Sequence, residues 1–512
     1  MKFKRTPLFV LLTGMLVTGC QGGPSSLVEN ANLYEPASYA IEYDAVRRAE
    51  GYSSVMPSLG DVKILVIPVQ FSDYPCSTLP GGCEGMKDNI ETSFFGTAEE
   101  TGWESLTSYY EKSSYGKLHI SGIVTDWYTS EFAATELANS TASNPVSTMI
   151  TKKATSWYKT TYSDSGTQFD SDSDGYIDAV WLVYSLEYNP VGEGMPEDSS
   201  VFWAFTAYNS GSQNVSNPGV FQYAWASYKF MYDNGWYERD EEGYLIKDDN
   251  GDPIFHNWED NEGNILLDSH TYVHETGHLM GLWDYYTYDD VDWGAAGGLD
   301  MMDYNVGDHN AYSKSLLNWT TPKVVQGSTK VTLAPFESSG QTLILTPNYT
   351  ETLCDEYLMV EFYTPTGLNQ KDSVDPYAGY YPKTFSVPGI KVYHVDSRVG
   401  KFKSTANGYV FNGYTTILAA ASNSGYTGIA HSNTASRSGN PDIKLLHLLE
   451  SSGENTFKHG GKATNDSLFV QGDTFGYDIF ANYTFNSGTL LGYQFTVTSV
   501  TEAGATLEII KL

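Results

Sequence analysis

The amino-acid sequence predicts an α+β protein, in which a mixed sheet with helices is followed by an all-β C-terminal region. Three observations support this fold class. Residues 62–71 read VKILVIPVQF, an almost unbroken apolar and β-branched run that is typical of a strand buried on both faces. Residues 268–281 begin with Asp and Ser and end with Gly, as a capped helix does. After residue 319 the pattern changes to short strands in close succession.

Length and composition indicate more than one folded domain. The chain has 512 residues, whereas a single hydrophobic core stops growing at about 250–300 residues. Hydrophobic residues make up 41% and aromatic residues 14%, which is enough for packed cores. The expected divisions are a signal segment at 1–19, a tether and N-terminal segment at 20–60, a first domain at 61–320, a β-rich continuation at 321–450 and a C-terminal β domain at 451–512.

The charge balance disfavours one class of partner. Lysine and arginine number 29 against 62 aspartates and glutamates, so the net charge is −33. Such a surface repels phosphate backbones, and we expect no nucleic-acid partner. The acidity is compatible with solubility outside the cell and with calcium binding, but it specifies neither.

The first residues have the pattern of an export signal. A basic start precedes an apolar run at 7–17, and the segment ends VTGC at 17–20. That ending resembles the bacterial lipobox, which implies that Cys20 is lipidated and becomes the first mature residue. An ordinary cleaved signal with an incidental cysteine is the alternative. No other apolar run reaches eighteen residues. We therefore expect membrane attachment only through this lipid, in a cell-surface or outer-membrane lipoprotein that can also be released.

The segments that follow alternate between strand and helix patterns. After the strand at 62–71, residues 103–128 read as a helix and then a strand. Residues 180–184, VWLVY, read as a second buried strand, and 203–237 carry short strand signals among aromatic residues. In the C-terminal region we expect a sandwich or similar β domain with strands at 330–334, 341–345, 357–361, 388–396 and 488–512.

An aspartate-rich loop precedes the strand at 180–184 and reads FDSDSDGYIDA. Side-chain oxygens at loop positions 1, 3, 5 and 9 and a backbone carbonyl at position 7 suit calcium, which prefers six to eight oxygen ligands. The EF-hand glutamate is missing at position 12, so further ligands would come from elsewhere in the chain. An acidic turn before a strand is the alternative. The predicted calcium ligands are Asp170, Asp172, Asp174, Tyr176 and Asp178.

The cysteines allow one small disulfide loop. Cys76 and Cys83 are close in sequence, and an exported protein permits a bridge between them. Two free thiols are the alternative. Cys354 then has no partner, because Cys20 is assigned to the lipid.

A metal-binding pattern lies in the predicted helix at 268–281. His274 and His278 frame the pattern H-E-x-x-H, and residues four apart share one face of a helix. Both imidazoles can therefore hold one metal ion. Glu275 follows the first histidine, where it could act as a general base on a water bound to that ion. A surface helix with two solvated histidines is the alternative.

The residues after the helix complete the predicted ligand set. Gly281 ends the helix, and the turn lets Asp284 supply a third ligand. Asp300 and Asp303 remain alternatives for that position. His270 lies one turn earlier on the same face and is interpreted as a neighbour. Two nitrogens and one oxygen leave the fourth tetrahedral position open, as a catalytic zinc needs.

A second segment, GGLDMMDY at 297–304, resembles the methionine turn that metzincin proteases place beneath their zinc. In the astacin and serralysin types a tyrosine follows two residues later, and Met302 and Tyr304 match that spacing. For Met302 alone, an ordinary core methionine is the alternative.

Together with AYSKSLLNW at 311–319, the stretch HETGHLMGLWDYY at 274–286 resembles the secreted metalloproteases of the immune inhibitor A type. That family uses H-E-x-x-H-x-x-G-x-x-D, and Asp284 holds the place of its aspartate. The resemblance implies a metzincin-like zinc metalloprotease domain at 61–320. Relative to the family, 238–264 reads as an acidic hairpin insertion that could overhang the cleft. A solvated surface decoration is the alternative.

These observations predict an exported, lipid-anchored zinc endopeptidase that acts on a protein or peptide, contains Zn²⁺ and Ca²⁺, and is monomeric. Glu275 would be the general base and acid, and Tyr304 would hydrogen-bond the ligand set or the oxyanion. A catalytically idle surface lipoprotein that acts as a binding module is one rival, but the complete ligand set counts against it. A calcium-stiffened structural protein is another, and it leaves the zinc pattern unexplained.

Overall fold

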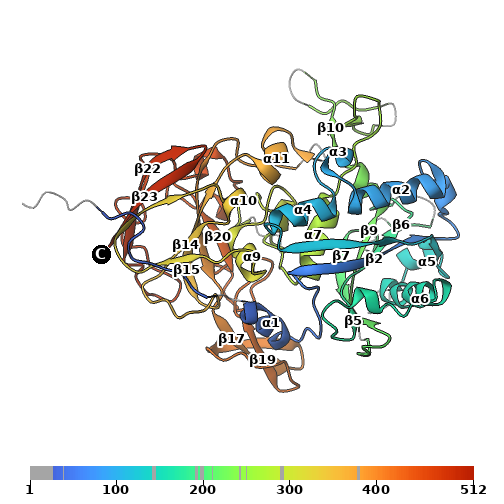
Figure 1. Ribbon diagram of the computed structural model, residues 1–512, viewed down its shortest axis with the longest axis horizontal. Coiled ribbons are helices and arrows are strands. Elements are labelled where there is room, and N and C mark those ends of the chain that lie inside the picture. Colours follow the sequence, from blue (N-terminus) through green and yellow to red (C-terminus); the bar gives the residue numbers. More distant parts are fainter. Residues whose placement is uncertain are drawn as a thin grey trace, which may run out of the picture.

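The protein has a mixed α+β fold, and much of it is β-structure. Figure 1 shows a sheet surrounded by helices at one end of the molecule and the sheets of the C-terminal region at the other, with a small arm projecting from the body. The computed structural model describes residues 27–37, 40–140, 146–190, 194–196, 201–209, 211–240, 244–248, 251–288, 293–377 and 381–512.

The first sheet is parallel except at one edge. Its path is β3 (Leu118–Val124), β2 (Gly60–Gln70), β6 (Val180–Tyr184), β9 (Gln222–Ser227) and β7 (Phe205–Tyr208). The edge strand β7 is antiparallel to β9, whereas β2 lies inside the sheet. The buried strands predicted at 62–71 and 180–184 are confirmed.

Alternate residues of β2 enter two different cores. Ile64 and Val66 belong to the cluster that contains Tyr272 of the metal-pattern helix, whereas Leu65 and Ile67 belong to the cluster on the opposite face. Because both faces are covered, the strand has no polar alternation. The first cluster is covered by α2 (Gly82–Phe95), α4 (Leu106–Ser113) and α7 (His270–Leu279), and the second by α5 (Ala134–Ala138) and α6 (Val146–Thr161). The predicted helix and strand within 103–128 are confirmed as α4 and β3.

The C-terminal region contains two sheets that share one apolar core. The first follows the order β1 (Leu33–Tyr34), β12 (Lys323–Val325), β14 (Thr342–Leu345), β15 (Glu356–Tyr363), β16 (Gly389–Asp396) and β20 (Leu446–Leu449). The second follows the order β13 (Thr329–Leu333), β23 (Gly504–Lys511), β22 (Tyr493–Thr501) and β21 (Thr474–Phe475). The strands predicted beyond residue 319 are confirmed, and β13 pairs with the last strand of the chain.

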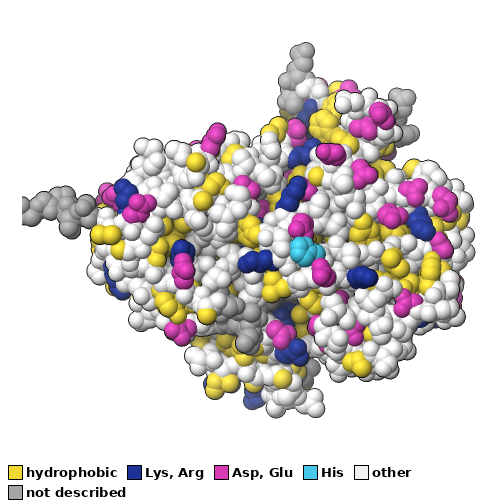
Figure 2. Space-filling view, viewed as in Figure 1, with side chains coloured by type: hydrophobic (Ala, Val, Ile, Leu, Met, Phe, Trp, Pro, Cys, Tyr) yellow, Lys and Arg dark blue, Asp and Glu magenta, His cyan; other side chains and the backbone are white. Residues whose placement is uncertain are grey.

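The segment at 238–264 forms hairpins, as predicted. β10 (Gly235–Tyr237) and β11 (Phe255–Asn257) pair antiparallel, and short bridges close further turns between them. The segment projects from the body in Figure 1, and Figure 2 shows the projection as a separate lobe with acidic and apolar side chains. On the face in Figure 2, acidic and basic side chains are interspersed.

The N-terminal segment contacts both the C-terminal sheets and the helix α7 of the first domain. β1 pairs with β12 of the C-terminal sheet, and α1 (Ala40–Ala49) packs against β19 (Gly425–Ile429). The backbone N–H of Met56 then donates to the Leu279 carbonyl at the end of α7 (2.9 Å). β19 belongs to a small sheet with β17 (Val399–Thr405) and β18 (Gly408–Tyr414).

The remaining elements are short. They are α3 (Ala98–Thr101), α8 (Met301–Tyr304), α9 (Ala311–Leu316), α10 (Phe336–Ser339), α11 (Gln370–Val374), β4 (Tyr128–Thr129), β5 (Tyr176–Ile177) and β8 (Gly219–Val220). Cys76 and Cys83 form a disulfide, and Cys354 is a half-buried thiol. Cys20 lies outside the described residues. Within the described part, no helix combines the length and the hydropathy needed to cross a bilayer.

Candidate metal centre

α7 carries the H-E-x-x-H residues and is buried over nearly its whole length. Its first residue, His270, donates its backbone N–H to Asp268 Oδ1 (2.9 Å). Beyond its end, Gly281 has a φ of +94°, and the Leu282 N–H donates back to the Gly277 carbonyl (3.0 Å). A residue with a Cβ would be strained at this φ, so glycine permits the sharp turn that the sequence predicts.

Three side-chain atoms converge at the second half of α7. His274 Nε2 lies 3.0 Å from Asp284 Oδ1, His278 Nε2 lies 3.1 Å from the same oxygen, and the two Nε2 atoms are 3.1 Å apart. Two zinc–ligand bonds of about 2.0–2.1 Å at a tetrahedral angle place neighbouring ligand atoms about 3.3 Å apart. The three residues therefore fit one tetrahedral ion, with one position left for water.

The other ring nitrogen of each histidine is bonded to a backbone carbonyl. His274 Nδ1 lies 2.7 Å from the Met301 carbonyl oxygen, and His278 Nδ1 lies 2.8 Å from the Leu282 carbonyl oxygen. Since a carbonyl only accepts, Nδ1 of each ring carries a proton, so the neutral form of each ring has its lone pair at Nε2. Two lone pairs and a carboxylate oxygen that face one another repel unless a cation or proton lies among them. The donor set itself favours a metal ion.

The carboxylate of Asp284 and the neighbouring imidazoles stabilise each other's charged forms. Burial opposes the charged form of His278, but the Asp284 carboxylate outweighs burial and raises the pKa of this imidazole to about 9. Burial also acts to raise the pKa of Asp284, but the two imidazoles hold it well below its usual range. Tyr288 donates a hydrogen bond to the second oxygen, Asp284 Oδ2. Asp284 is therefore ionised and oriented for a cation.

Glu275 lies beside the ligands and is only 5% exposed. Burial raises the pKa of its carboxyl group, although the two neighbouring imidazoles act in the opposite direction. Thr206 of β7 holds it, because Thr206 Oγ1 lies 3.2 Å from Glu275 Oε2 and 3.0 Å from the Glu275 carbonyl oxygen. A carboxyl group with a raised pKa, fixed next to a metal-binding group, suits a general base. The sequence gives no local signal for Thr206, which lies 69 residues earlier.

Met302 lies directly against α7. A Cβ built on Gly277 would come within 2.6 Å of Met302 Sδ, so the helix backbone and the methionine are in close contact. Asp300 fixes this turn, because its Oδ1 accepts the Met302 N–H (2.9 Å). Its Oδ2 accepts the backbone N–H and the side-chain amide of Asn310 (3.0 and 2.8 Å). With both oxygens of Asp300 used in this way, Asp284 is the carboxylate that joins the metal-binding group.

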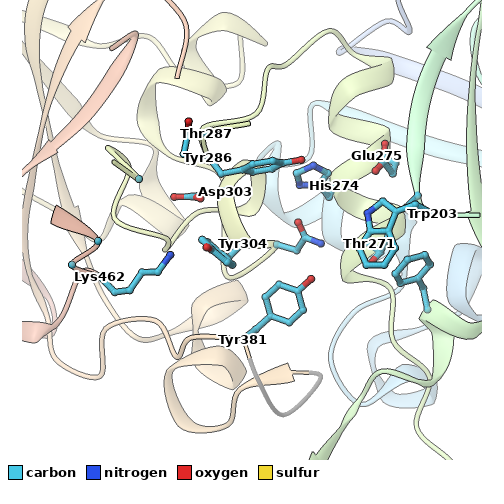
Figure 3. Close-up of a pocket in the computed structure, with 16 residues that line it drawn as sticks. Trp203, Thr271, His274, Glu275, Tyr286, Thr287, Asp303, Tyr304, Tyr381 and Lys462 are labelled. Atoms are coloured by element: carbon cyan, nitrogen blue, oxygen red, sulfur yellow. The ribbon is translucent and has the colours of Figure 1, made fainter. Parts of the chain in front are cut away.

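The tyrosines near the site differ in what they contact. Tyr304 lines the cavity beside His274, and its ring lies 3.8 Å from the Lys462 ammonium. Tyr286 extends toward His274 in Figure 3, and their ring centroids are 6.4 Å apart. Sequence reasoning missed Tyr286 and Tyr288, although both follow the third ligand within four residues. Their position in the tyrosine-rich stretch after Asp284 is the signal that could have identified them.

His270 is not part of the metal-binding group. Its Nδ1 lies 2.8 Å from Asp268 Oδ2, and its Nε2 lies 3.2 Å from Asp372 Oδ2. The ring is stacked between Trp103 and Tyr377, at centroid distances of 3.7 and 4.1 Å. This histidine therefore anchors the first turn of α7, as a neighbour of the site.

Two cavities adjoin the metal-binding group. One of about 640 Å³ is lined by His274 and Glu275, and Figure 3 shows it in close-up. Another of about 250 Å³ is lined by His278, Asp284 and again Glu275. Glu275 thus borders both cavities. No described residue of 238–264 lines either one.

The aspartate-rich loop forms a second cluster of oxygen ligands. Carboxylate oxygens of Asp170, Asp172 and Asp174 lie within 4.8 Å of one another. Gly175, with a φ of +88°, turns the chain and donates its N–H to Asp170 Oδ2 (3.0 Å). The other oxygen, Asp170 Oδ1, is buried without a hydrogen-bond partner among the described residues. Burial raises the pKa of Asp172, and the neighbouring Asp174 carboxylate raises it further.

Asp178 and Tyr176 lie beside this cluster. Asp178 Oδ2 accepts the backbone N–H and the hydroxyl of Ser171 (2.9 and 2.6 Å), whereas Asp178 Oδ1 is buried with no hydrogen-bond partner in the described part. Burial raises the pKa of Asp178 to about 7. Tyr176 donates its backbone N–H to Asp174 Oδ1 (2.8 Å). Clustered carboxylates with unpartnered buried oxygens suit a hard cation such as calcium.

No protein-family model matches the chain, and no curated protein matches its sequence. The function has therefore to be inferred from the site itself. Its parts are a donor set of two nitrogens and one oxygen, a buried carboxyl group beside it, and two cavities that both border that carboxyl group.

Proposed function

We propose that the protein is a zinc-dependent endopeptidase with a metzincin-like catalytic domain, exported and held at a membrane by a lipid on Cys20. The observation that carries this proposal is the convergence of His274 Nε2, His278 Nε2 and Asp284 Oδ1 to within 3.1 Å of one another. Glu275 lies buried beside them and borders the adjoining cavities.

The roles of the residues follow from their contacts. His274, His278 and Asp284 would hold a zinc ion, which would supply a bound water with a pKa of about 7 and polarise a carbonyl group. A carboxylate oxygen of Glu275 accepts the proton of the attacking water, and the same group later donates it to the leaving amine nitrogen. Tyr304 lines the same cavity and offers a phenol donor for the oxyanion.

The edge of the first sheet suits an extended peptide. β7 is the last strand of that sheet, and its Thr206 is bonded to Glu275. A peptide that adds as a strand to this edge would satisfy its backbone groups on β7. Its scissile bond would then lie next to Glu275, with neighbouring residues in the two cavities. A protein or peptide substrate fits this arrangement.

We also propose that Asp170, Asp172 and Asp174 bind calcium, with Asp178 supporting the loop. The three carboxylates are close enough to share one ion. The buried oxygens Asp170 Oδ1 and Asp178 Oδ1 have no hydrogen-bond partner among the described residues, which supports a cation site at this loop. The disulfide between Cys76 and Cys83 is compatible with export.

Elemental analysis of the purified chain from residue 21 onward, together with a casein assay, tests the proposed function. We expect one equivalent of zinc and hydrolysis that a chelator abolishes. Glu275→Gln should keep the zinc and lower the rate by about 10²–10⁴-fold, because the general base is lost. The matched control is Glu111→Gln, which changes a half-exposed carboxyl group that contacts His119 and should affect neither property.

Two outcomes would contradict the proposal. One is a protein without zinc. The other is a Glu275→Gln variant that hydrolyses casein at the wild-type rate. A protein that binds zinc and cleaves no substrate would instead favour a binding module that keeps the metalloprotease-like site.

A further inference from the structure

The larger cavity has an aromatic wall and a polar wall. Trp203 lines it near α7, and Asp303, Tyr304 and Lys462 line it on the opposite side (Figure 3). Phe230 also lines the cavity and packs against Trp203, with ring centroids 5.5 Å apart. Lys462 is the one lysine or arginine among the described residues that line this cavity. A cation opposite the catalytic carboxyl group is in position to contact a substrate residue that flanks the scissile bond.

The side chain of Lys462 is held in place. Its ammonium lies 3.8 Å from the centroid of the Tyr304 ring, a cation–π contact that restricts the flexible chain. The loop around it is fixed, because the Gly461 N–H donates to the Thr456 carbonyl (3.0 Å) and the Ala463 N–H donates to the Gly297 carbonyl (2.9 Å). The loop is thus bonded to the segment that leads into α8.

Lys462 differs from the lysines of this chain that form ion pairs. Lys87, Lys112 and Lys153 form ion pairs with carboxylates, as expected for a protein with a net charge of −33. Within the described part of the chain, the Lys462 ammonium has no carboxylate in ion-pair contact. A cation that faces a cavity without such a partner is suited to an anionic substrate group.

Asp303 provides a second, independent sign of a ligand. It is 3% exposed, and its Oδ2 accepts the Gly298 N–H (2.7 Å). Its Oδ1 is buried and has no hydrogen-bond partner among the described residues. Burial raises the pKa of Asp303 to about 7, against the lowering effect of Lys462. The wall of the cavity thus contains a buried carboxyl oxygen that the described residues leave unpartnered.

We propose that this cavity binds a carboxylate of the substrate through Lys462, so that the enzyme prefers peptides with an acidic group next to the scissile bond. The inference rests on the proposed endopeptidase function and adds a specificity-determining residue to it. Two sources of the carboxylate are possible chemically: an Asp or Glu side chain, and the free C-terminus of a peptide.

Cleavage of paired peptides by the full zinc-bound chain tests the inference. One peptide has Glu beside the cleavage site, mapped by mass spectrometry, and the others have Gln or Lys there. We expect kcat/KM to be about fivefold higher for Glu than for Gln, the upper end for an exposed ion pair. Lys462→Ala should bring this ratio to about one, Lys462→Arg should keep it, and Lys462→Glu should favour the Lys peptide.

A nearby lysine and C-terminal amidation serve as controls. Lys458 pairs with Asp442 and does not line the cavity, so Lys458→Ala should leave the ratio unchanged. Loss of cleavage on amidation would assign the carboxylate to the free C-terminus, whereas unchanged cleavage would assign it to the side chain. An unchanged ratio in Lys462→Glu, or a wild-type preference for Lys, overturns the inference alone. A wild-type chain that cleaves no peptide overturns the proposed function as well.

Discussion

One turn of α7 separates His270 from His274, yet the two imidazoles have opposite surroundings. His270 has a carboxylate at each ring nitrogen, Asp268 at 2.8 Å and Asp372 at 3.2 Å. His274 has the carbonyl of Met301 at Nδ1, and its Nε2 points at the metal-binding group. The first ring can donate from both nitrogens, whereas the second donates from only one.

The difference shows that the partner of each ring nitrogen decides the role of a histidine. Burial opposes a charge on His270, but Asp268 and Asp372 outweigh burial and raise its pKa to about 9. Both ring nitrogens of His270 are bonded to these carboxylates, so neither is free to face a metal ion. The hydrogen bond from His274 Nδ1 to the Met301 carbonyl oxygen fixes the neutral tautomer whose lone pair is at Nε2. The same residue type therefore anchors one turn and, in the proposed zinc site, serves as a ligand in the next.

The largest expected effect is that of His274→Asn, which removes a ligand from the metal group. Even the outer partners of metal ligands change affinity by about 10–100-fold, so we expect zinc binding to weaken by more than about 100-fold. Hydrolysis should fall by about 10³-fold or more, a change of about 4 kcal/mol in activation free energy. Zinc titration and casein hydrolysis measure the two effects. Retention of one tightly bound equivalent would show that the ligand assignment is wrong.

The matched substitution one turn earlier, His270→Gln, should keep zinc binding and lower the stability of the fold. Zinc stoichiometry should stay at one equivalent, because His270 is outside the metal group. The free energy of unfolding at pH 6 should fall by about 3 kcal/mol, since the variant leaves Asp268 and Asp372 buried without their cation. Urea unfolding followed by tryptophan fluorescence measures this loss. A loss under about 0.5 kcal/mol would mean that the buried pairs add no stability.

The pH dependence of that loss sharpens the comparison. The pKa of His270 is raised in the folded state from 6.5 to about 9, so the folded protein binds more protons in this interval. The stability that His270 contributes is fully present below pH 6.5 and is lost as the pH rises through about 9. The difference in unfolding free energy between wild type and His270→Gln should therefore shrink by about 1.4 kcal/mol per pH unit within that interval. A constant difference from pH 6 to pH 10 would exclude a charged His270.

Much of the fold could be predicted from local sequence patterns. β2 was predictable because its residues are apolar without alternation, and the structure buries Ile64 and Leu65 in cores on opposite faces. The turn after α7 was predictable because Gly281 tolerates a positive φ. The pairing of β13 with the last strand was not, because it joins segments far apart in the chain and strand patterns do not name their partners.

In the candidate site, too, some residues could be predicted from local patterns and others could not. His274 and His278 were predictable because helical spacing is local, and Asp284 follows only six residues after His278. The anchoring of His270 was not predictable, because Asp372 lies 102 residues away. Lys462 was not predictable either, since it enters the cavity from a loop bonded to Gly297. Residues that reach the site across the fold depend on the chain path, which sequence patterns do not specify.

The smallest effect concerns the partner that orients Asp284. Tyr288 donates to Asp284 Oδ2, so Tyr288→Phe removes a hydrogen bond while the ligand atom Oδ1 stays. Because the Tyr288 ring is largely exposed, we expect the lower end of such effects, about tenfold weaker zinc binding in a chelator competition. Tyr304→Phe is the matched control, since the Tyr304 ring contacts Lys462 and should leave zinc affinity unchanged. If Tyr304→Phe weakened zinc binding more than Tyr288→Phe, the tyrosine after the methionine turn would be the one that supports the ligand set.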